Sequence, residues 1–181
     1  MKKLNQFITE KFRISKDNLE PHYQPKTKDE LRELLKKLIN ERGINADLND
    51  IDTSKITDMK ELFYESDFNG DISEWDVSNV TDMECMFDES EFNGDISLWD
   101  VSNVKNMKWM FANSEFNDDI SQWDVSNVNN MYKMFSYSEF NGDISQWDVS
   151  KVKNMGWMFN FCPLSKNPPK WYQEWYDKNA T

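Results

Sequence analysis

The hydrophobic positions of this chain return every 24 residues. From Phe68 the sequence reads FNGDISEWDVSNVTDMECMFDESE, and closely similar strings begin at Phe92, Phe116 and Phe140. Thirteen of the 24 positions are identical in these four copies, and a more divergent copy begins at Ile44. Self-similarity at a fixed period of this length is typical of repeat architectures, in which each unit packs mainly against its neighbours.

Each copy contains two hydrophobic patterns. Residues 72–77 follow the spacing apolar-x-x-apolar-x-apolar, which predicts a short strand. Residues 80–87 place apolar side chains at i, i+3 and i+7, which predicts a short helical turn with Ser78 as its N-cap. Stacked copies would align the strands in parallel. We therefore expect an α/β repeat solenoid of leucine-rich-repeat-like coils, each made of a short parallel strand and a short helical turn.

The ends of the chain do not follow the repeat, and we expect them to cap it. Residues 1–43 form the N-terminal helical cap, 44–163 the five 24-residue repeats, and 164–181 the C-terminal cap. Thr27 to Glu30 is a capping box for a helix over 28–42, which Gly43 ends. A further short helix is expected over 4–13. Trp171 and Trp175 lie at i and i+4 of a short C-terminal helix.

The repeat string N-G-D-I-S-x-W-D-V-S-N-V-x-x-M-x-x-M-F resembles the BspA-like or DUF285 family, the bacterial surface protein repeat common in mycoplasmas. The resemblance covers residues 44–163, and the stretch from Thr27 to Phe63 is similar to the segment that often precedes these repeats. It implies a leucine-rich-repeat-like solenoid. It also implies protein binding or adhesion, often at a cell surface, and no enzymatic activity.

Composition excludes several kinds of site. His22 is the only histidine, so a histidine-based catalytic triad or multi-histidine metal site is excluded by count. Cys85 and Cys162 are too few for a disulfide framework or a zinc site. No nucleophile elbow or glycine-rich phosphate loop is present. We therefore predict no enzyme and no cofactor.

Charge is distributed unevenly along the chain. The formal net charge is −12, and residues 44–163 carry seven Lys/Arg against twenty-four Asp/Glu, a balance of −17. A surface of this sign repels nucleic acid phosphates and favours a partner with a basic surface. We expect a protein partner, no direct nucleic acid binding, and a monomer.

One aspartate recurs in all five copies and is the first candidate for partner binding. This ladder is Asp52, Asp76, Asp100, Asp124 and Asp148. In a parallel sheet these like charges would lie side by side on its exposed face, which destabilises the sheet unless something offsets them. Three explanations are open: hydrogen bonds to nearby turn amides or to the Ser78-type hydroxyls, a basic partner along the sheet, or a row of Ca²⁺ ions.

The recurring tryptophans and methionines are expected in the core, and the recurring Asn69-type amides are expected to bond backbone across coils. The positions that vary between copies are better candidates for specificity. Among these an aromatic patch is predicted along one flank, comprising Trp109, Tyr132, Tyr137 and Trp157. Large exposed aromatic side chains mark interfaces, although partial burial between coils would also accommodate them.

Together these features predict a non-enzymatic, acidic protein-binding module, either a bacterial interaction protein or a host-contact protein. Two alternatives stay open. One is an intracellular inhibitor that imitates nucleic acid to block a basic nucleic-acid-binding protein, and the other is a calcium-stabilised structural repeat protein. If Met1 is the native start, the lack of an apolar signal segment predicts a cytoplasmic protein. The family resemblance implies the cell surface instead.

Overall fold

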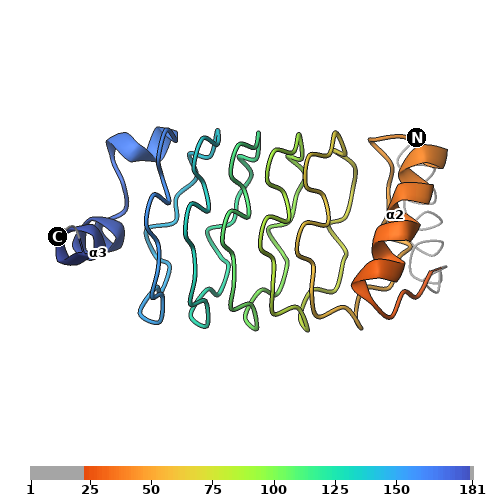
Figure 1. Cartoon of the computed structure of the whole chain (residues 1–181), viewed down its shortest axis with the longest axis horizontal. Coiled ribbons are helices and arrows are strands. Elements are labelled where there is room, and N and C mark those ends of the chain that lie inside the picture. Colours follow the sequence, from red (N-terminus) through yellow and green to blue (C-terminus); the bar gives the residue numbers. More distant parts are fainter. Residues whose placement is uncertain (1–22, 180–181) are drawn as a thin grey trace, which may run out of the picture.

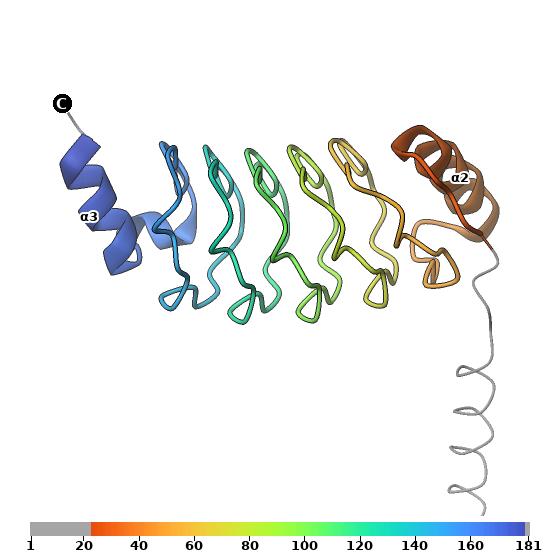
Figure 2. The ribbon, with the colours of Figure 1, turned by 90° about the horizontal axis from the view of Figure 1, so that it is seen from below.

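The computed structural model describes residues 23–179. It contains two α-helices, α2 (Lys28–Arg42) and α3 (Lys170–Asn179), and one 3-10 helix, η1 (Pro163–Lys166), within those residues. Between α2 and η1 the chain winds into coils stacked along the long axis of the molecule (Figure 1). We number them coil 1 (44–67), coil 2 (68–91), coil 3 (92–115), coil 4 (116–139) and coil 5 (140–163). α2 lies at one end of the stack and α3 at the other (Figure 2).

The predicted α/β repeat solenoid is wrong. Within residues 23–179 the structure has no strand, and neither α-helix falls in the repeats. Neighbouring coils are joined by isolated parallel bridges of one residue pair each, such as Asp58 with Asp82 and Asp82 with Asn106. The leucine-rich-repeat-like strand and helical turn are therefore absent from the described coils, which are built from successive turns.

Hydrogen bonds between coils explain why no helical turn forms. Each coil contributes eight residues to one face of the stack, which we call the turn face; its segments are residues 58–65, 82–89, 106–113, 130–137 and 154–161. In the second segment the N–H groups of Met83, Cys85, Phe87 and Glu89 donate to carbonyls of coil 3, at 2.9 to 3.0 Å. In a helix each of these N–H groups would instead donate to the carbonyl four residues earlier in the chain. The prediction of a helical turn over 80–87 is wrong for this reason.

Two residues of each turn-face segment have a left-handed backbone. Cys85 has φ 54° and Glu89 has φ 56°, and the same two positions recur in every coil, so that ten non-glycine residues share this conformation. The Met86 N–H donates to the Met83 carbonyl at 3.2 Å, closing a β-turn around Cys85. A left-handed residue other than glycine costs about 1–2 kcal/mol, so the hydrogen bonds between coils must offset this cost.

The predicted strand over 72–77 is also replaced by turns. The Trp75 N–H donates to the Ile72 carbonyl at 3.2 Å, and the Val80 N–H donates to the Val77 carbonyl at 2.9 Å. Ser78 is not an N-cap: its N–H and hydroxyl both donate to the Asp76 carboxylate, at 3.0 and 2.6 Å. The chain therefore changes direction at the positions where extended backbone was expected.

The predicted core is confirmed. The recurring tryptophans and methionines are buried, and the Trp75 and Trp99 rings stack at 6.5 Å. Each recurring indole also donates to a carbonyl of the preceding coil, as from Trp123 Nε1 to the Ile96 carbonyl at 3.1 Å. The asparagine row bonds across coils as expected, because Asn69 Oδ1 accepts from the Asn93 N–H at 2.9 Å.

The two α-helices close the stack. Thr27 caps α2 by accepting from the Glu30 N–H, and Gly43 ends the helix with φ 95°. Leu31, Leu35 and Leu38 of α2 are buried against coil 1, as their spacing predicts. In α3, Trp171 Nε1 donates to the Ile144 carbonyl at 3.0 Å, which repeats the tryptophan bond of each coil. The helix predicted over 4–13 lies outside the described residues.

Replacing Trp123 by phenylalanine tests the tryptophan ladder. The substitution removes the indole bond to the Ile96 carbonyl and part of a buried ring. We expect the free energy of unfolding to fall by about 1–3 kcal/mol, measured by urea denaturation. Trp157→Phe is the matched control, because Trp157 is 60% exposed and makes no such bond. Equal losses in both variants would contradict the assignment.

Candidate functional site

The turn face presents the side chains that vary most between copies. Its left-handed residues are listed here in coil order: Glu61, Glu65, Cys85, Glu89, Trp109, Asn113, Lys133, Tyr137, Trp157 and Phe161. The backbone N–H groups of the eight in coils 1 to 4 donate to the next coil, which holds these residues in place, and none of the ten side chains is buried. Sparsely populated backbone conformations that persist at a surface are often found at functional sites.

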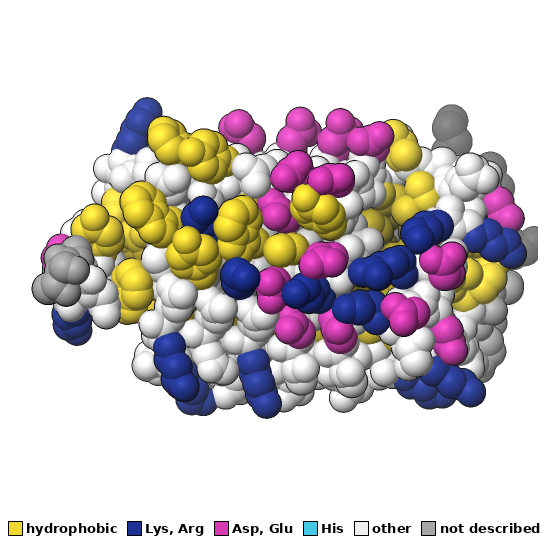
Figure 3. Space-filling model, viewed as in Figure 1, with side chains coloured by type: hydrophobic (Ala, Val, Ile, Leu, Met, Phe, Trp, Pro, Cys, Tyr) yellow, Lys and Arg dark blue, Asp and Glu magenta, His cyan; other side chains and the backbone are white. Residues whose placement is uncertain are grey.

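Aromatic side chains gather on the half of this face next to α3. Tyr137 is 56% exposed, Trp157 60% and Phe161 71%. The rings of Tyr137 and Phe161 stack with centroids 4.6 Å apart. Figure 3 shows hydrophobic side chains clustered over this end of the stack. We call Trp109, Tyr132, Tyr137, Trp157 and Phe161 the aromatic cluster. Phe161 was not among the predicted site residues, although it occupies the position of Tyr137 in the next copy.

The structure brings two of the predicted aromatic residues together in the middle of the face. Trp109 and Tyr132 lie with ring centroids 6.4 Å apart, and both are half-buried. Lys133 Nζ lies 4.4 Å from the Trp109 centroid and 5.5 Å from the Tyr132 centroid. A cation over these rings is attracted by their π electrons. Of the four predicted aromatic residues, Trp109 and Tyr132 are therefore partly buried and Tyr137 and Trp157 are exposed, and their role in partner binding stays a prediction.

The aspartate ladder lies outside the turn-face segments. In each coil one of its carboxylate oxygens accepts from the N–H two residues on, as Asp124 does from Ser126 at 3.0 Å. Of the three explanations for the ladder, hydrogen bonding to turn amides and serine hydroxyls is the one that the structure contains. Binding of a basic partner by Asp52, Asp76, Asp100, Asp124 and Asp148 stays a prediction.

These hydrogen bonds change the acidity of three carboxyl groups of the ladder. The side-chain and backbone hydrogen bonds from Ser54 and Ser126 lower the pKa of Asp52 and Asp124. The backbone and side-chain bonds from Ser150 lower the pKa of Asp148 in the same way. A carboxylate with a lowered pKa favours the folded state above its ordinary pKa near 4, and that contribution is lost as the pH falls below it. Asp52, Asp124 and Asp148 therefore favour the folded state at neutral pH.

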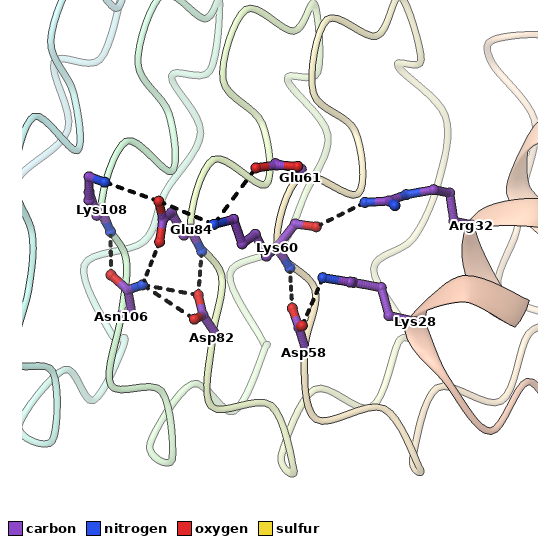
Figure 4. Close-up of polar contacts among 9 residues, drawn as sticks. All are labelled: Lys28, Arg32, Asp58, Lys60, Glu61, Asp82, Glu84, Asn106 and Lys108. Atoms are coloured by element: carbon purple, nitrogen blue, oxygen red, sulfur yellow. Dashed lines mark hydrogen bonds and ion pairs between the residues drawn. The ribbon is translucent and has the colours of Figure 1, made fainter.

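Acidic groups of the turn face near α2 are partly neutralised by the chain's own lysines. Lys28 of α2 pairs with Asp58 at 2.8 Å, and Lys60 lies 3.5 Å from Glu84 (Figure 4). Arg32 donates to the Lys60 carbonyl at 3.5 Å, which places a cation on a carbonyl of the first turn-face segment. The contacts of Lys28 and Arg32 join α2 to coil 1, and the pair of Lys60 with Glu84 joins coil 1 to coil 2.

Glu84 is the centre of this network. Its carboxylate accepts from Lys108 Nζ at 3.1 Å and from Asn106 Nδ2 at 3.0 Å. Burial alone would raise the pKa of Glu84, but the bonds from Lys108 and Asn106 outweigh it, so the pKa is lowered. The Asp58 and Glu84 carboxylates already have cationic or amide partners, so a basic ligand would have to displace those partners.

A second group of carboxylates lies at the ends of the turn-face segments and makes no ion pair with the described residues. This acidic edge consists of Glu65, Asp67, Glu89, Glu91, Glu115 and Glu139, all exposed. Sequence reasoning missed it, although a Ser-Glu dipeptide recurs at the end of copies two to four. Acidity is also concentrated in coils 1 and 2, with fifteen Asp/Glu against two Lys/Arg, whereas coils 3 to 5 carry nine against five.

Other classes of site find no support in the part of the chain described. No group of three or more His, Cys, Asp or Glu among residues 23–179 could hold a metal ion. Both cysteines are free, and burial raises the pKa of the Cys85 thiol to about 11, which keeps it protonated at neutral pH. His22 lies outside the described residues. The two helices of the described chain are too short or too polar to cross a bilayer.

One protein family matches the chain. Its model is described as "Mycoplasma protein of unknown function, DUF285" and matches residues 31–137 and 92–175, which together span all five repeats and reach into α3. Searches of curated proteins and of solved structures gave no match.

Asp88 offers a direct test of the electrostatics of this face. It is 5% exposed and accepts from Asn113 Nδ2 at 3.0 Å, and burial raises its pKa. A raised carboxyl pKa disfavours the folded state above that pKa, and the penalty disappears below the ordinary value near 4. We expect Asp88→Asn to raise the thermal midpoint by a few degrees at pH 7.

The control for this prediction is the pH itself. The difference between the wild-type chain and Asp88→Asn should shrink as the pH is lowered to about 4, because the wild-type carboxyl then takes up its proton. A destabilised variant at pH 7, or a gain that does not depend on pH, would contradict burial as the cause. Differential scanning calorimetry across this range measures both.

Proposed function

We propose that this chain, which belongs to the DUF285 family, is a non-catalytic protein-binding module that uses its turn face. The observation that carries the proposal is the aromatic cluster. Tyr137, Trp157 and Phe161 each have a left-handed backbone, a conformation that costs free energy to maintain, and more than half of each side chain is exposed. Aromatic side chains are enriched at the centres of protein interfaces, where their burial contributes most to affinity.

The charge of the neighbouring surface narrows the partner. The acidic edge makes no ion pair with residues 23–179, so its carboxylates are available to cations from outside. A partner with an apolar patch beside a basic strip would cover the aromatic cluster and the acidic edge together. Complementary charge of this kind mainly raises the rate of association and selects between partners.

The rigidity of the face supports the same role. On the turn face, four hydrogen bonds link each pair of neighbouring coils and hold the backbone under the cluster, for example Lys133 N to the Gly156 carbonyl at 3.0 Å and Phe135 N to the Met158 carbonyl at 3.0 Å. Side chains on a preorganised backbone lose less entropy on binding. Whether the partner belongs to the same cell or to a host stays a prediction.

Affinity capture from native lysate with matched variants tests this function. One variant carries Tyr137→Ala, Trp157→Ala and Phe161→Ala, and the other carries Asp76→Asn, Asp100→Asn and Asp124→Asn. We expect the aromatic variant to lose the captured protein by about tenfold or more and the aspartate variant to retain it. Raising the salt concentration should weaken capture, because the acidic edge contributes.

The reverse pattern, with capture lost in the aspartate variant alone, would assign binding to the ladder and overturn the turn face. Capture unaffected by either set would also reject the proposal. Added nucleic acid gives a further arm, because competition by it would favour the inhibitor that imitates nucleic acid. Circular dichroism should confirm that both variants retain the wild-type fold.

A further inference from the structure

The last coil ends the hydrogen-bond row with donors that have no acceptor. In coil 4 the N–H groups of Lys133, Phe135 and Tyr137 donate to carbonyls of coil 5 at 3.0, 3.0 and 2.7 Å. The equivalent donors of coil 5 are the N–H groups of Trp157 and Phe159 and of Phe161. Within residues 23–179 none of these three has a hydrogen-bond acceptor. Backbone N–H groups at such positions are normally paired, and Phe159 is itself buried.

A groove lies beside two of these donor residues, Trp157 and Phe159. Its volume is 390 Å³, and one wall is formed by Trp157, Phe159 and Asn160 of coil 5. The other wall is formed by Tyr172, Trp175 and Tyr176 of α3. We call it the terminal groove. A volume of this size falls within the range of about 300–1,000 Å³ that is usual for ligand sites.

The terminal groove occupies the place where the turn-face segment of another coil would lie. α3 fills only part of that place, because Trp171 takes over the tryptophan position with its bond to the Ile144 carbonyl. From there α3 diverges from coil 5 (Figure 2), and the terminal groove lies between them. The inner junctions show which groups the row donates to: the main-chain carbonyls of every second residue in a parallel neighbour.

The chemistry of the walls identifies one kind of occupant. Carbonyls at alternate residues, all on one side, are what an extended peptide presents. The aromatic walls favour apolar side chains between those carbonyls. A second copy is less suited, because at the carbonyl end of its own row the Lys60 carbonyl already accepts from Arg32 of α2, at 3.5 Å.

We propose that the terminal groove binds an extended apolar peptide segment of a partner protein, whose alternate carbonyls accept from the N–H groups of Trp157, Phe159 and Phe161. This proposal rests on the proposed protein-binding function and assigns it a second contact. The bound segment continues the row of hydrogen bonds by one further chain. Its side chains pack between Trp157 and the exposed ring of Tyr176.

The test uses the whole chain and a defined probe, an end-capped fluorescein-labelled octapeptide of alternating leucine and threonine. We expect fluorescence anisotropy to show saturable binding. Tyr176→Ala should weaken it by about tenfold, and Tyr64→Ala should change it by less than about twofold. Both tyrosines are exposed, at 52% and 42%, and Tyr64 lies in coil 1 at the other end, so the pair is matched.

A second measurement does not depend on any protein variant. Replacing alternate amides of the probe by esters weakens their carbonyls as acceptors, and we expect the affinity for the wild-type chain to fall. The amide protons of Phe159 and Phe161 should also shift in NMR spectra when the amide probe binds. No binding, equal binding by both variants, equal affinity for the ester probe, or self-association that the probe does not compete would overturn the proposal.

The two proposals fail separately. If the lysate experiment succeeds and the octapeptide does not bind, the turn face binds its partner without the terminal groove. If the octapeptide binds as expected and the aromatic variant still captures the partner from lysate, peptide binding by the terminal groove is supported and partner binding by the aromatic cluster is rejected.

Discussion

The structure depends on one row of hydrogen bonds between coils, in which alternate N–H groups of each turn-face segment donate to the carbonyls of the next coil. At the junction between coils 3 and 4 the bonds from Met107, Trp109, Phe111 and Asn113 measure 2.9 to 3.0 Å. Because every bond runs the same way, each segment must alternate its peptide orientation, and two residues per coil become left-handed. This alternation excludes both helix and regular strand, and it leaves the Trp, Met and Phe rows to form the core.

The same constraint connects the fold to the candidate site. Left-handed residues carry side chains that do not join the core, so positions such as Tyr137 and Trp157 vary between copies without disturbing the stack. A row that runs one way also has two unlike ends. Its carbonyl end faces α2, where Arg32 bonds the Lys60 carbonyl, and its N–H end borders the groove beside α3. The aromatic cluster and the N–H groups without an acceptor among the described residues lie on the same half of the molecule.

Sequence reasoning found the repeat, its register, the core and both capping helices, because these follow from hydrophobic spacing and from Thr27 and Gly43. It failed within the coil. The i, i+3, i+7 pattern of residues 80–87 fits a helix. However, a pair of turns whose N–H groups donate to the neighbouring coil buries the same side chains equally well. Side-chain spacing does not distinguish a helix from these turns. Cys, Trp and Lys residues rarely have a left-handed backbone, so the residue types at Cys85, Trp109 and Lys133 do not predict one. One signal was available: Trp171 lies 24 residues after Trp147 and marks α3 as the continuation of the ladder.

Amide hydrogen exchange on the isolated chain, read residue by residue by NMR, tests the one-way row most directly. Equivalent N–H groups differ only in whether a further coil follows. The account predicts slow exchange at Trp109, Phe111 and Asn113 and at their equivalents in coil 4, and much faster exchange at Trp157, Phe159 and Phe161. Equal protection of the inner and terminal amides, or rapid exchange throughout the row, would contradict it.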